Sequence, residues 1–456
     1  MKIQTNKNKL DISDLHEILI AHASDAQRKL KLKRYFIGKH DAILQKPERA
    51  NDAPNNRLIS NFPAYISTMS TGFFIGQPVV YKSATENEDE VKILSEIFKY
   101  NDEAAHNLEL AEESSITGEA FELLYTDSDA QIRFTAVPSE EVILVCDSTL
   151  EQNVICAIRH FKIYALNQTT YTEFVDVYDE KEVRHYEYNS SLKFLGSEPH
   201  YFDDVPIVEY PNNKQRRGDF EDVLSLVDAY NLAQSLSLDD LSDFTDAFLI
   251  LKGMGGTNGD DVKELRRNKV IPLDDGGAAE WLIKNLNDTY VENMKNRLQT
   301  DIHKFSNIPD MSDSNFAGNA SGVAIKYKLI GLEQIRSRKE REFKKALQRR
   351  IELIAGILKL KNQTQIDFRD IEIVFTANIP ANLQEMAQIV TTLDGMISQK
   401  TLLSLLPFVT DPLEEISEIQ REKDEEFSAV DKNNFPNLTE EHDHDEQQNL
   451  LGTATT

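Results

Sequence analysis

A run of about forty residues without proline, from Ser321 to Leu360, restricts the fold of this chain more than any other stretch. Alanine, leucine, glutamate, lysine, glutamine and arginine dominate the run, and Ser321 is suited to cap its start. Composition and capping therefore both predict one long α-helix. At about 1.5 Å per residue this helix would span roughly 60 Å, about twice the width of a small domain. Few monomeric enzymes need such a rod.

The second half of this predicted helix carries a narrow apolar stripe at intervals of four, four, three and four residues. Its members are Phe343, Leu347, Ile351, Ile354 and Leu358. This spacing keeps the five side chains on one face of a helix. We therefore expect a partner helix to cover the stripe.

The same helix is strongly basic. Between Lys326 and Arg350 the sequence has ten basic and three acidic residues, a local charge of +7 in a chain whose net charge is −27. These bases either form a solvated face paired with the protein's own acids, or contact DNA or acidic neighbouring subunits. The sequence alone leaves both interpretations open.

The overall charge limits the classes of function. The chain has 456 residues, enough for about two to four domains, with 77 acidic and 50 basic side chains. This balance argues against a simple nucleic-acid binder, because tight DNA binding requires lysine and arginine to neutralise phosphates. An acidic wall, in contrast, repels the duplex and lets DNA pass without gripping it.

Cysteine content and hydrophobic runs indicate in which cellular environment the protein folds. Cys146 and Cys156 are too few for a disulfide framework or a cysteine metal site, and they fit an intracellular, reducing origin. No apolar run approaches the roughly 20 residues needed to cross a bilayer, and no signal peptide is evident. We therefore expect no membrane partner.

Hydrophobic periodicity places helices and strands in different parts of the chain. The predicted helices span about 12–20, 90–100, 103–116, 219–245, 287–306, 384–399 and 412–426. Short β-like runs between turn residues predict a sheet-containing lobe, with strands near 121–125, 141–146, 154–159, 172–178 and 205–210, and a further strand near 371–375. The expected fold class is α+β, mainly helical.

The predicted helix at 219–245 has an unusual charge pattern. Between Gly218 and Leu251 there are eight acidic residues and no basic one, whereas a solvated face normally mixes both signs. We expect this helix to present a one-sided acidic surface.

A glycine-rich insert after this helix is the strongest enzyme-like signal. An apolar run leads into Gly253-x-Gly255 and then a helix, as in a dinucleotide-binding turn, and Asp274 could mimic the ribose-binding acid. However, Asn258 stands where the third glycine is required, and the flanking long helices leave no doubly wound sheet. The insert is also no P-loop, because no Gly-Lys-Ser/Thr closes it.

No other motif points to catalysis. His442–Asp445 alternates histidine with aspartate and could hold a divalent metal, but weak adventitious binding is the commoner outcome in an acidic tail. There is no Gly-x-Ser-x-Gly, no His-Glu-x-x-His and no cysteine beside a base. We therefore expect no enzymatic activity, no cofactor and no metal site.

A series of short motifs resembles, in order and spacing, the portal proteins of long-tailed bacteriophages that infect Gram-positive bacteria. The resemblance is collinear from about residue 30 to residue 425. The motifs are Tyr35–His40, Pro54–Arg57, Gly72–Pro78, Pro211–Asn213, Gly218–Glu221, Asn319–Ala324 and Ile379–Asn382.

The resemblance implies a portal-type subunit with a wing, a stem, a clip and a crown. A helical segment at 1–29 would precede the wing at 30–217, and stem helices at 218–246 and 287–308 would flank a clip at 247–286. A tunnel loop at 309–321 would lead to a long wing helix and wing strand at 322–382. Crown helices at 383–427 and an acidic disordered tail at 428–456 would follow. Apolar stripes on the long helices would be buried between subunits.

The resemblance also implies a passive conduit. About twelve subunits would form a ring at one capsid vertex, through which double-stranded DNA is packaged and ejected. The implied partners are further copies of the chain, the terminase large subunit, a head-completion adaptor, and the major capsid and scaffolding proteins. The protein would reside in the virion, and in the host cytoplasm during assembly.

The resemblance assigns three groups of site residues. The tunnel loop would meet the duplex through Asp313, Ser314, Asn315, Phe316 and Asn319. The stem would line the channel with Asp228, Asp239, Asp240 and Asp243. The clip would dock terminase and the adaptor through Lys252, Lys263, Arg266, Arg267 and Lys269.

Two other functions stay open at this point. A nucleotide-binding enzyme built on the Gly253–Gly259 loop would show a thermal shift with dinucleotides. A cytoplasmic helical scaffold without DNA would form a dimer or an elongated bundle, whereas a portal must close a ring.

Overall fold

The fold is known from a computed structural model. It describes residues 1–7, 9–50, 53–85, 87–166, 169–244, 248–252, 278–282, 288–312, 322–361, 366–377, 383–406, 409 and 411–434. Helix outweighs strand, 51% to 21%, which confirms a mixed, mainly helical fold. The chain separates into two compact units, Met1–Asn378 and Ile379–Thr456. In the ranges given above, no helix combines the length and apolar character needed to cross a membrane.

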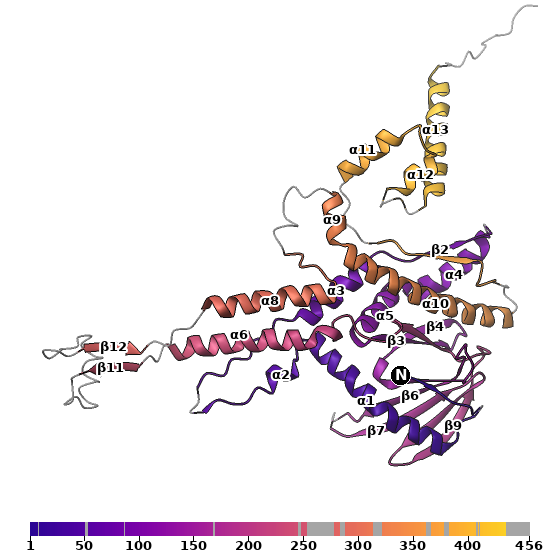
Figure 1. The fold of residues 1–456 in the computed structure, drawn as a ribbon. Helices are drawn as coiled ribbons and strands as arrows, with labels where there is room; N and C mark the ends of the chain where they lie inside the picture. The colour runs from indigo at the N-terminus through magenta and orange to yellow at the C-terminus, as the bar shows by residue number, and fades with distance from the viewer. Residues whose placement is uncertain are drawn as a thin grey trace, which may run out of the picture. The chain divides into compact units, whose positions relative to one another are not determined.

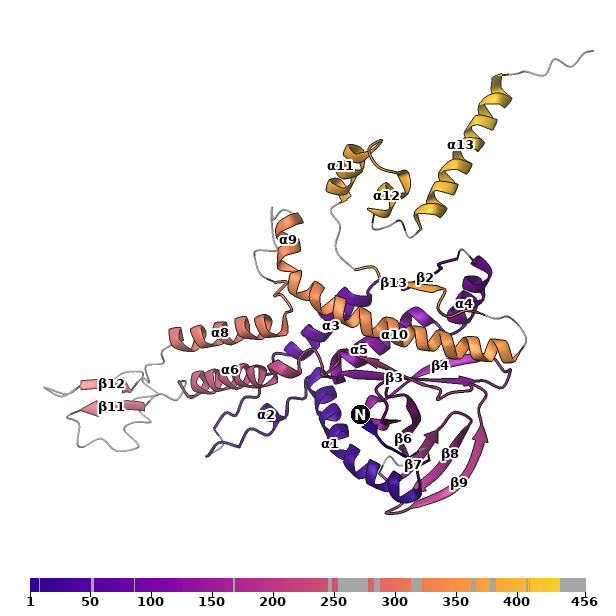
Figure 2. The same cartoon turned by 45° about the vertical axis from the view of Figure 1, so that its right-hand side comes forward.

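The centre of the first unit is a three-stranded antiparallel sheet. Its strands are β10 (Ile207–Pro211), β3 (Glu119–Thr126) and β4 (Ile132–Val137), in that order. The helices α3 (Phe62–Ile75), α5 (Glu103–Thr117) and α10 (Ile330–Leu360) pack with it, and α10 lies along β10 and α3 (Figures 1 and 2). Beside this core, β13 (Ile371–Val374) pairs antiparallel with β2 (Val80–Ser83), which precedes α4 (Glu88–Tyr100).

The apolar stripe of α10 is buried inside its own chain. All five of its members, Phe343 to Leu358, are at most 3% exposed, and they join one core with residues of β3, β4, β10 and α3. The expectation that this stripe would be buried between subunits is therefore wrong. The central sheet and α3, which lie far away in the sequence, already cover it.

A six-stranded sheet forms the second layer. Its order is β1 (Lys2–Gln4), β5 (Val142–Cys146), β6 (Val154–Tyr164), β7 (Tyr171–Tyr178), β8 (Glu182–Tyr188) and β9 (Leu192–Pro199). Only the pairing of β1 with β5 is parallel among these strands. Helix α1 (Ile12–Phe36) covers one face, where Leu15 and Leu19 pack with Val175 and Val177. Both cysteines lie buried as free thiols in β5 and β6.

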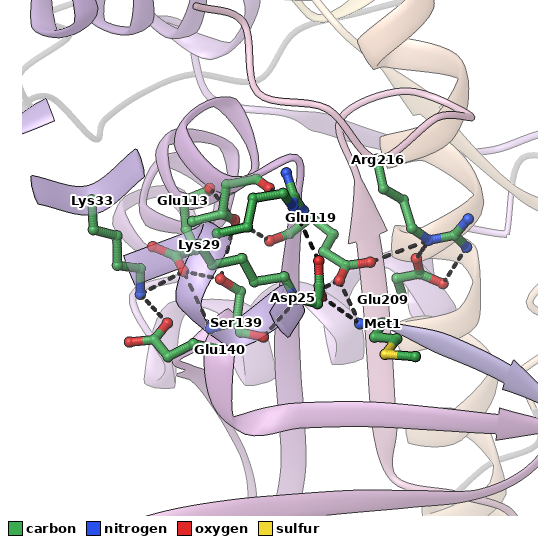
Figure 3. A network of polar contacts seen from close by, with 12 residues as sticks. Met1, Asp25, Lys29, Lys33, Glu113, Glu119, Ser139, Glu140, Glu209 and Arg216 are labelled. Atoms are coloured by element: carbon green, nitrogen blue, oxygen red, sulfur yellow. Dashed lines mark hydrogen bonds and ion pairs between the residues drawn. The ribbon is translucent and has the colours of Figure 1, made fainter. Parts of the chain in front are cut away.

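A buried polar network ties α1 to the central sheet (Figure 3). The ammonium of Lys29, which is not exposed, lies 2.5 Å from Glu119 Oε1 and donates to the carbonyl of Ser139 at 2.8 Å. Arg216 approaches the other oxygen of Glu119 at 3.2 Å. Burial on its own raises the pKa of Glu119, but the Met1 amino group and Lys29 outweigh it and hold that pKa at about 2. The carboxylate therefore stays charged inside the protein.

The predicted single rod is wrong at its start. Two helices occupy this stretch, α9 (Gly322–Lys328) and α10, and the helix breaks at Leu329. Leu329 is 6% exposed and packs with Ile302 and Ile308. A Cβ on Gly331 would lie 3.2 Å from the carbonyl oxygen of Asn307, so glycine permits this close approach. The proposed cap, Ser321, lies outside the described residues.

The described residues of the second unit form the helices α11 (Leu383–Leu393), α12 (Gln399–Ser404) and α13 (Pro412–Asn434). The single helix predicted at 384–399 is wrong, because Gly395 adopts a positive φ of 76° and Ser398 caps a new helix by accepting from the Thr401 N–H. Helix α13 runs to Asn434, so the disorder predicted from Ser428 is wrong for residues 428–434. The His442–Asp445 motif lies outside the described residues.

Candidate functional site

A helical hairpin is the candidate site in the first unit. Helix α6 (Leu224–Phe244) packs side by side with α8 (Asp288–Ser306) (Figures 1 and 2). The sequence predicted helices at 219–245 and 287–306, close to both. Between them in the chain, β11 (Phe248–Lys252) pairs antiparallel with β12 (Ala278–Leu282). A dinucleotide-binding turn needs the strand before its glycines to lie in a parallel sheet. Because β11 belongs to a two-stranded antiparallel ribbon, the arrangement does not support the nucleotide-binding alternative.

The hairpin is rooted in the protein core. Val227 at the start of α6 and Ile302 near the end of α8 are fully buried. They pack with Tyr35, Ile66 and Leu332, which come from α1, α3 and α10. The root is therefore held by three other helices.

Away from the root, the hairpin exposes large apolar side chains. On α6, Leu232, Leu236 and Leu241 are 40%, 46% and 61% exposed, and on α8, Tyr290 and Met294 are 64% and 45% exposed. Leu232 and Leu236 are one helical turn apart and therefore lie on one face of α6. Exposed apolar patches mark contact sites for other macromolecules.

One face of α6 is covered by an extended segment, 56–60, through a regular ladder of hydrogen bonds. The backbone N–H groups of Ser60, Leu58 and Asn56 donate to the side chains of Asn231, Ser235 and Asp239, at 2.7, 3.0 and 2.7 Å. The spacings match because four helical residues rise about 6 Å and two extended residues about 6.6 Å. The segment is thereby aligned along the helix.

This ladder changes the expected acidic surface of α6. Asp239 is 2% exposed, forms an ion pair with Lys46, and also accepts from the side chain of Asn56 at 2.8 Å. Burial alone would raise the pKa of Asp239, but its hydrogen bonds from Lys46 and Asn56 outweigh this and lower the pKa. Asp239 is thus an internal partner in the single chain and does not belong to an open acidic face.

The other predicted stem acids differ from Asp239. Asp228 is half-buried and accepts from the Tyr35 hydroxyl at 3.2 Å, and burial is the main cause of its raised pKa. Asp240 is half-buried. Asp243 lies in the last turn of α6, and its side chain is outside the described set. The channel-lining role of these acids stays a prediction.

The remaining predicted site residues lie mostly outside the described ranges. Of the clip bases, Lys252 ends β11 and is exposed. The clip residues Lys263, Arg266, Arg267 and Lys269 and the tunnel-loop residues Asp313, Ser314, Asn315, Phe316 and Asn319 belong to stretches that the structure does not describe.

The segment just before the predicted tunnel loop is anchored by residues that the sequence did not single out. The hydroxyl of Tyr65 donates to the carbonyl of Pro309 and accepts from the N–H of Met311, both at 2.9 Å. Gln299 donates to Asp310 at 3.0 Å. Since Tyr65 lies on α3 and Gln299 on α8, two elements fix this segment. No local motif would have revealed a pairing 244 residues apart.

Several basic residues of α10 form ion pairs with acidic residues of the same chain. Arg350 and Lys339 are buried ion-pair partners of Glu122 and Asp219. Arg336, Lys345 and Arg349 pair with acids at the surface. For these five residues, pairing with the protein's own acids is confirmed.

Comparison with known proteins identifies the family. A family model described as "Phage portal protein, SPP1 Gp6-like" matches residues 15–428. A portal protein of Clostridium phage phiCD119 is 24% identical over 94% of this chain and 100% of its own length. The portal protein of Bacillus phage SPP1 is 24% identical over 86% of this chain and 83% of its own length. A chain in the solved structure "Neck of empty GTA particle computed with C6 symmetry" shows a TM-score of 0.46 and 11% identity, over 83% of this chain and 93% of that one.

The family model spans nearly all of the described chain, including the core around α10 and the α6–α8 hairpin. Both curated relatives also match over most of their own length. This protein belongs to the SPP1 Gp6-like family of phage portal proteins.

Proposed function

We propose that this protein assembles into a closed ring of about twelve copies at one vertex of a phage capsid, and that double-stranded DNA passes through the ring during packaging and ejection. The ring is also the docking site for the terminase large subunit and the head-completion adaptor, and it contacts the major capsid and scaffolding proteins. The protein is then a virion component that has passed through the host cytoplasm during assembly.

The exposed apolar surface of the α6–α8 hairpin carries this proposal. Leu232 and Leu236 on α6 and Met294 on α8 are 40–46% exposed in the single chain. In a ring, the α6 side of one copy packs on the α8 side of the next. This contact is heterologous, so repeating it closes a ring when the rotation between copies divides a full turn.

The parts of the chain then take the following roles. The stem is 218–246 with 287–308, the clip is 247–286 and the tunnel loop is 309–321. The wing comprises 30–217 and 322–382, and 383–427 forms the crown. Asp240 and Asp243 keep the channel wall negative so that DNA slides, the loop around Phe316 touches the duplex, and Lys252 with the other clip bases meets terminase and the adaptor.

Negative-stain imaging of the purified protein, with native mass spectrometry in parallel, tests the ring. We expect particles with a central hole and about twelve or thirteen subunits. Leu236→Glu should lower the ring fraction, because it places a charge in the contact. Leu195→Glu is the matched control, since Leu195 is 49% exposed but lies on β9.

Two results would count against the proposal. A monomer or dimer that persists at high concentration favours the helical scaffold, and rings that form equally well with Leu236→Glu remove the assigned contact. DNA packaging gives a further test of the tunnel loop, because unchanged packaging after Phe316→Ala and after deletion of residues 313–318 would exclude its assigned role.

A further inference from the structure

The described side chains of the second unit form almost no core. Among residues 388–406, 409 and 411–424, whose side chains are described, Leu402 is the one buried hydrophobic residue. Ile389, Met396, Leu405 and Leu413 are 38–76% exposed. A unit of this size buries too little apolar surface to be stable alone. Its three helices therefore need another surface.

The net charge of the second unit indicates which kind of surface would complement it. Leu383–Asp424 contains eight acidic and three basic residues, a net charge of −5. Glu414, Glu415 and Glu418 are exposed on the first turns of α13 beside Leu413. A complementary surface combines basic with apolar side chains.

Helix α10 carries such a surface opposite its buried stripe. Ile330, Gln334, Arg338, Arg341 and Lys345 follow intervals of four, four, three and four residues, and all five are exposed. We call them the outer stripe of α10. Ile330 is 57% exposed, and the neighbouring Tyr327 of α9 is 72% exposed.

Of the three charged members of the outer stripe, Lys345 pairs with Glu342. Arg336 and Lys339, which flank Arg338, are taken up by ion pairs inside the chain. Arg338 and Arg341 have no ion-pair partner among the residues that the structure describes. The outer stripe thus presents two guanidinium groups next to apolar surface.

The stretch that contains the outer stripe is basic, whereas the rest of the chain is acidic. The stretch 326–350 holds ten of the 50 basic residues but three of the 77 acidic ones, so the rest of the chain has a net charge of −34. In the ring of the proposed function, on which this inference rests, every copy carries both the acidic unit and the outer stripe. Each copy can then dock on the next, and the contact repeats around the ring.

We propose that α11–α13 of each copy dock on the outer stripe of α10 in a neighbouring copy. Carboxylates of α13 meet Arg338 and Arg341, and exposed apolar residues of the second unit cover Ile330 and Tyr327. The second unit thereby gains its missing core on assembly and links adjacent copies.

Isotopically mixed rings test this docking. Equal amounts of unlabelled and ¹⁵N-labelled chains are co-assembled and treated with a carbodiimide, which couples lysines directly to carboxylates. We expect cross-links between the Lys345 peptide and the α13 peptide, about half of them joining a light to a heavy chain, as random mixing of neighbours requires. Cross-links confined to chains of one isotope would show docking within a chain and overturn the proposal.

Charge reversal sharpens the test. Arg338→Glu with Arg341→Glu should reduce the mixed cross-links about ten-fold, because like charges then face each other. Lys193→Glu is the control, since this side chain on β9 is 75% exposed, and it should leave the cross-links unchanged. Rings that lack the mixed cross-link overturn this inference alone, whereas the absence of rings in native mass spectra removes the proposed function and this inference with it.

Discussion

The Nη2 atom of Arg350 lies 2.7 Å from Oε1 of Glu122, and both side chains are fully buried. Arg350 also approaches Glu103 at 3.2 Å and donates to Asn107 at 2.8 Å. One cation therefore joins α10 to α5 and β3 in the middle of an apolar core. Removing one side of such a pair leaves a charge buried without compensation.

Arg350→Met should lower the free energy of unfolding by about 3–5 kcal/mol, because Glu122 and Glu103 lose their cation. Its sequence neighbour Arg349 gives the control. Arg349 is 31% exposed and pairs with Asp204 at the surface, so Arg349→Met should cost under about 1 kcal/mol. Urea unfolding of both variants at neutral pH measures the difference, and equal losses would contradict it.

His22 should make stability depend on pH. It is 2% exposed, and burial lowers its pKa from 6.5 to about 4. Between these values the unfolded chain binds a proton that the folded chain does not, so this contribution is complete above about pH 6.5 and is lost as the pH falls toward 4. We expect a loss of about 2 kcal/mol between pH 7 and pH 5. Urea unfolding across this range should show a flatter profile for His22→Gln than for the unchanged chain, and equal slopes would contradict the assignment.

Gly218 should not tolerate a side chain. A Cβ at this position would lie 2.3 Å from the carbonyl oxygen of Ile116, so Gly218→Ala should lower the free energy of unfolding by about 1–3 kcal/mol or more. Gly72→Ala is the control, because a Cβ there meets nothing within 4 Å. Within α3 that change should stabilise by about 0.5–1 kcal/mol. Thermal unfolding of the two variants should therefore shift in opposite directions.

Ser235 should anchor the segment 56–60. Its hydroxyl accepts from the Leu58 N–H at 3.0 Å, so Ser235→Ala should cost about 1–3 kcal/mol and speed hydrogen exchange at Leu58. Ser237, two residues on, donates to the carbonyl of Ala233 in its own helix. Ser237→Ala should leave exchange at Leu58 unchanged. Similar exchange in both variants would show that the ladder does not hold the segment.

Local pattern was sufficient for most helices and for six of the thirteen strands that the structure describes. Helices α4, α5 and α8 and strands β3, β5, β7 and β10 lie within a few residues of their predicted positions. Periodicity works here because one face of each element is buried, and this spacing is written in neighbouring residues. The pattern failed at Leu329 and Gly395, where single backbone positions end a helix that composition would continue.

The sequence by itself determined the helix and strand content and, through the order of its motifs, the family. Tertiary structure decided which charged side chains are paired inside the protein and which stay exposed and can contact other molecules. Lys46 pairs with Asp239 across 193 residues, and Arg350 with Glu122 across 228. Asp239 and Arg350 each looked like part of a one-signed surface in the sequence. Burial requires that charges be paired, and the partner is set by which distant segments pack together, so no local pattern could separate buried charges from exposed ones.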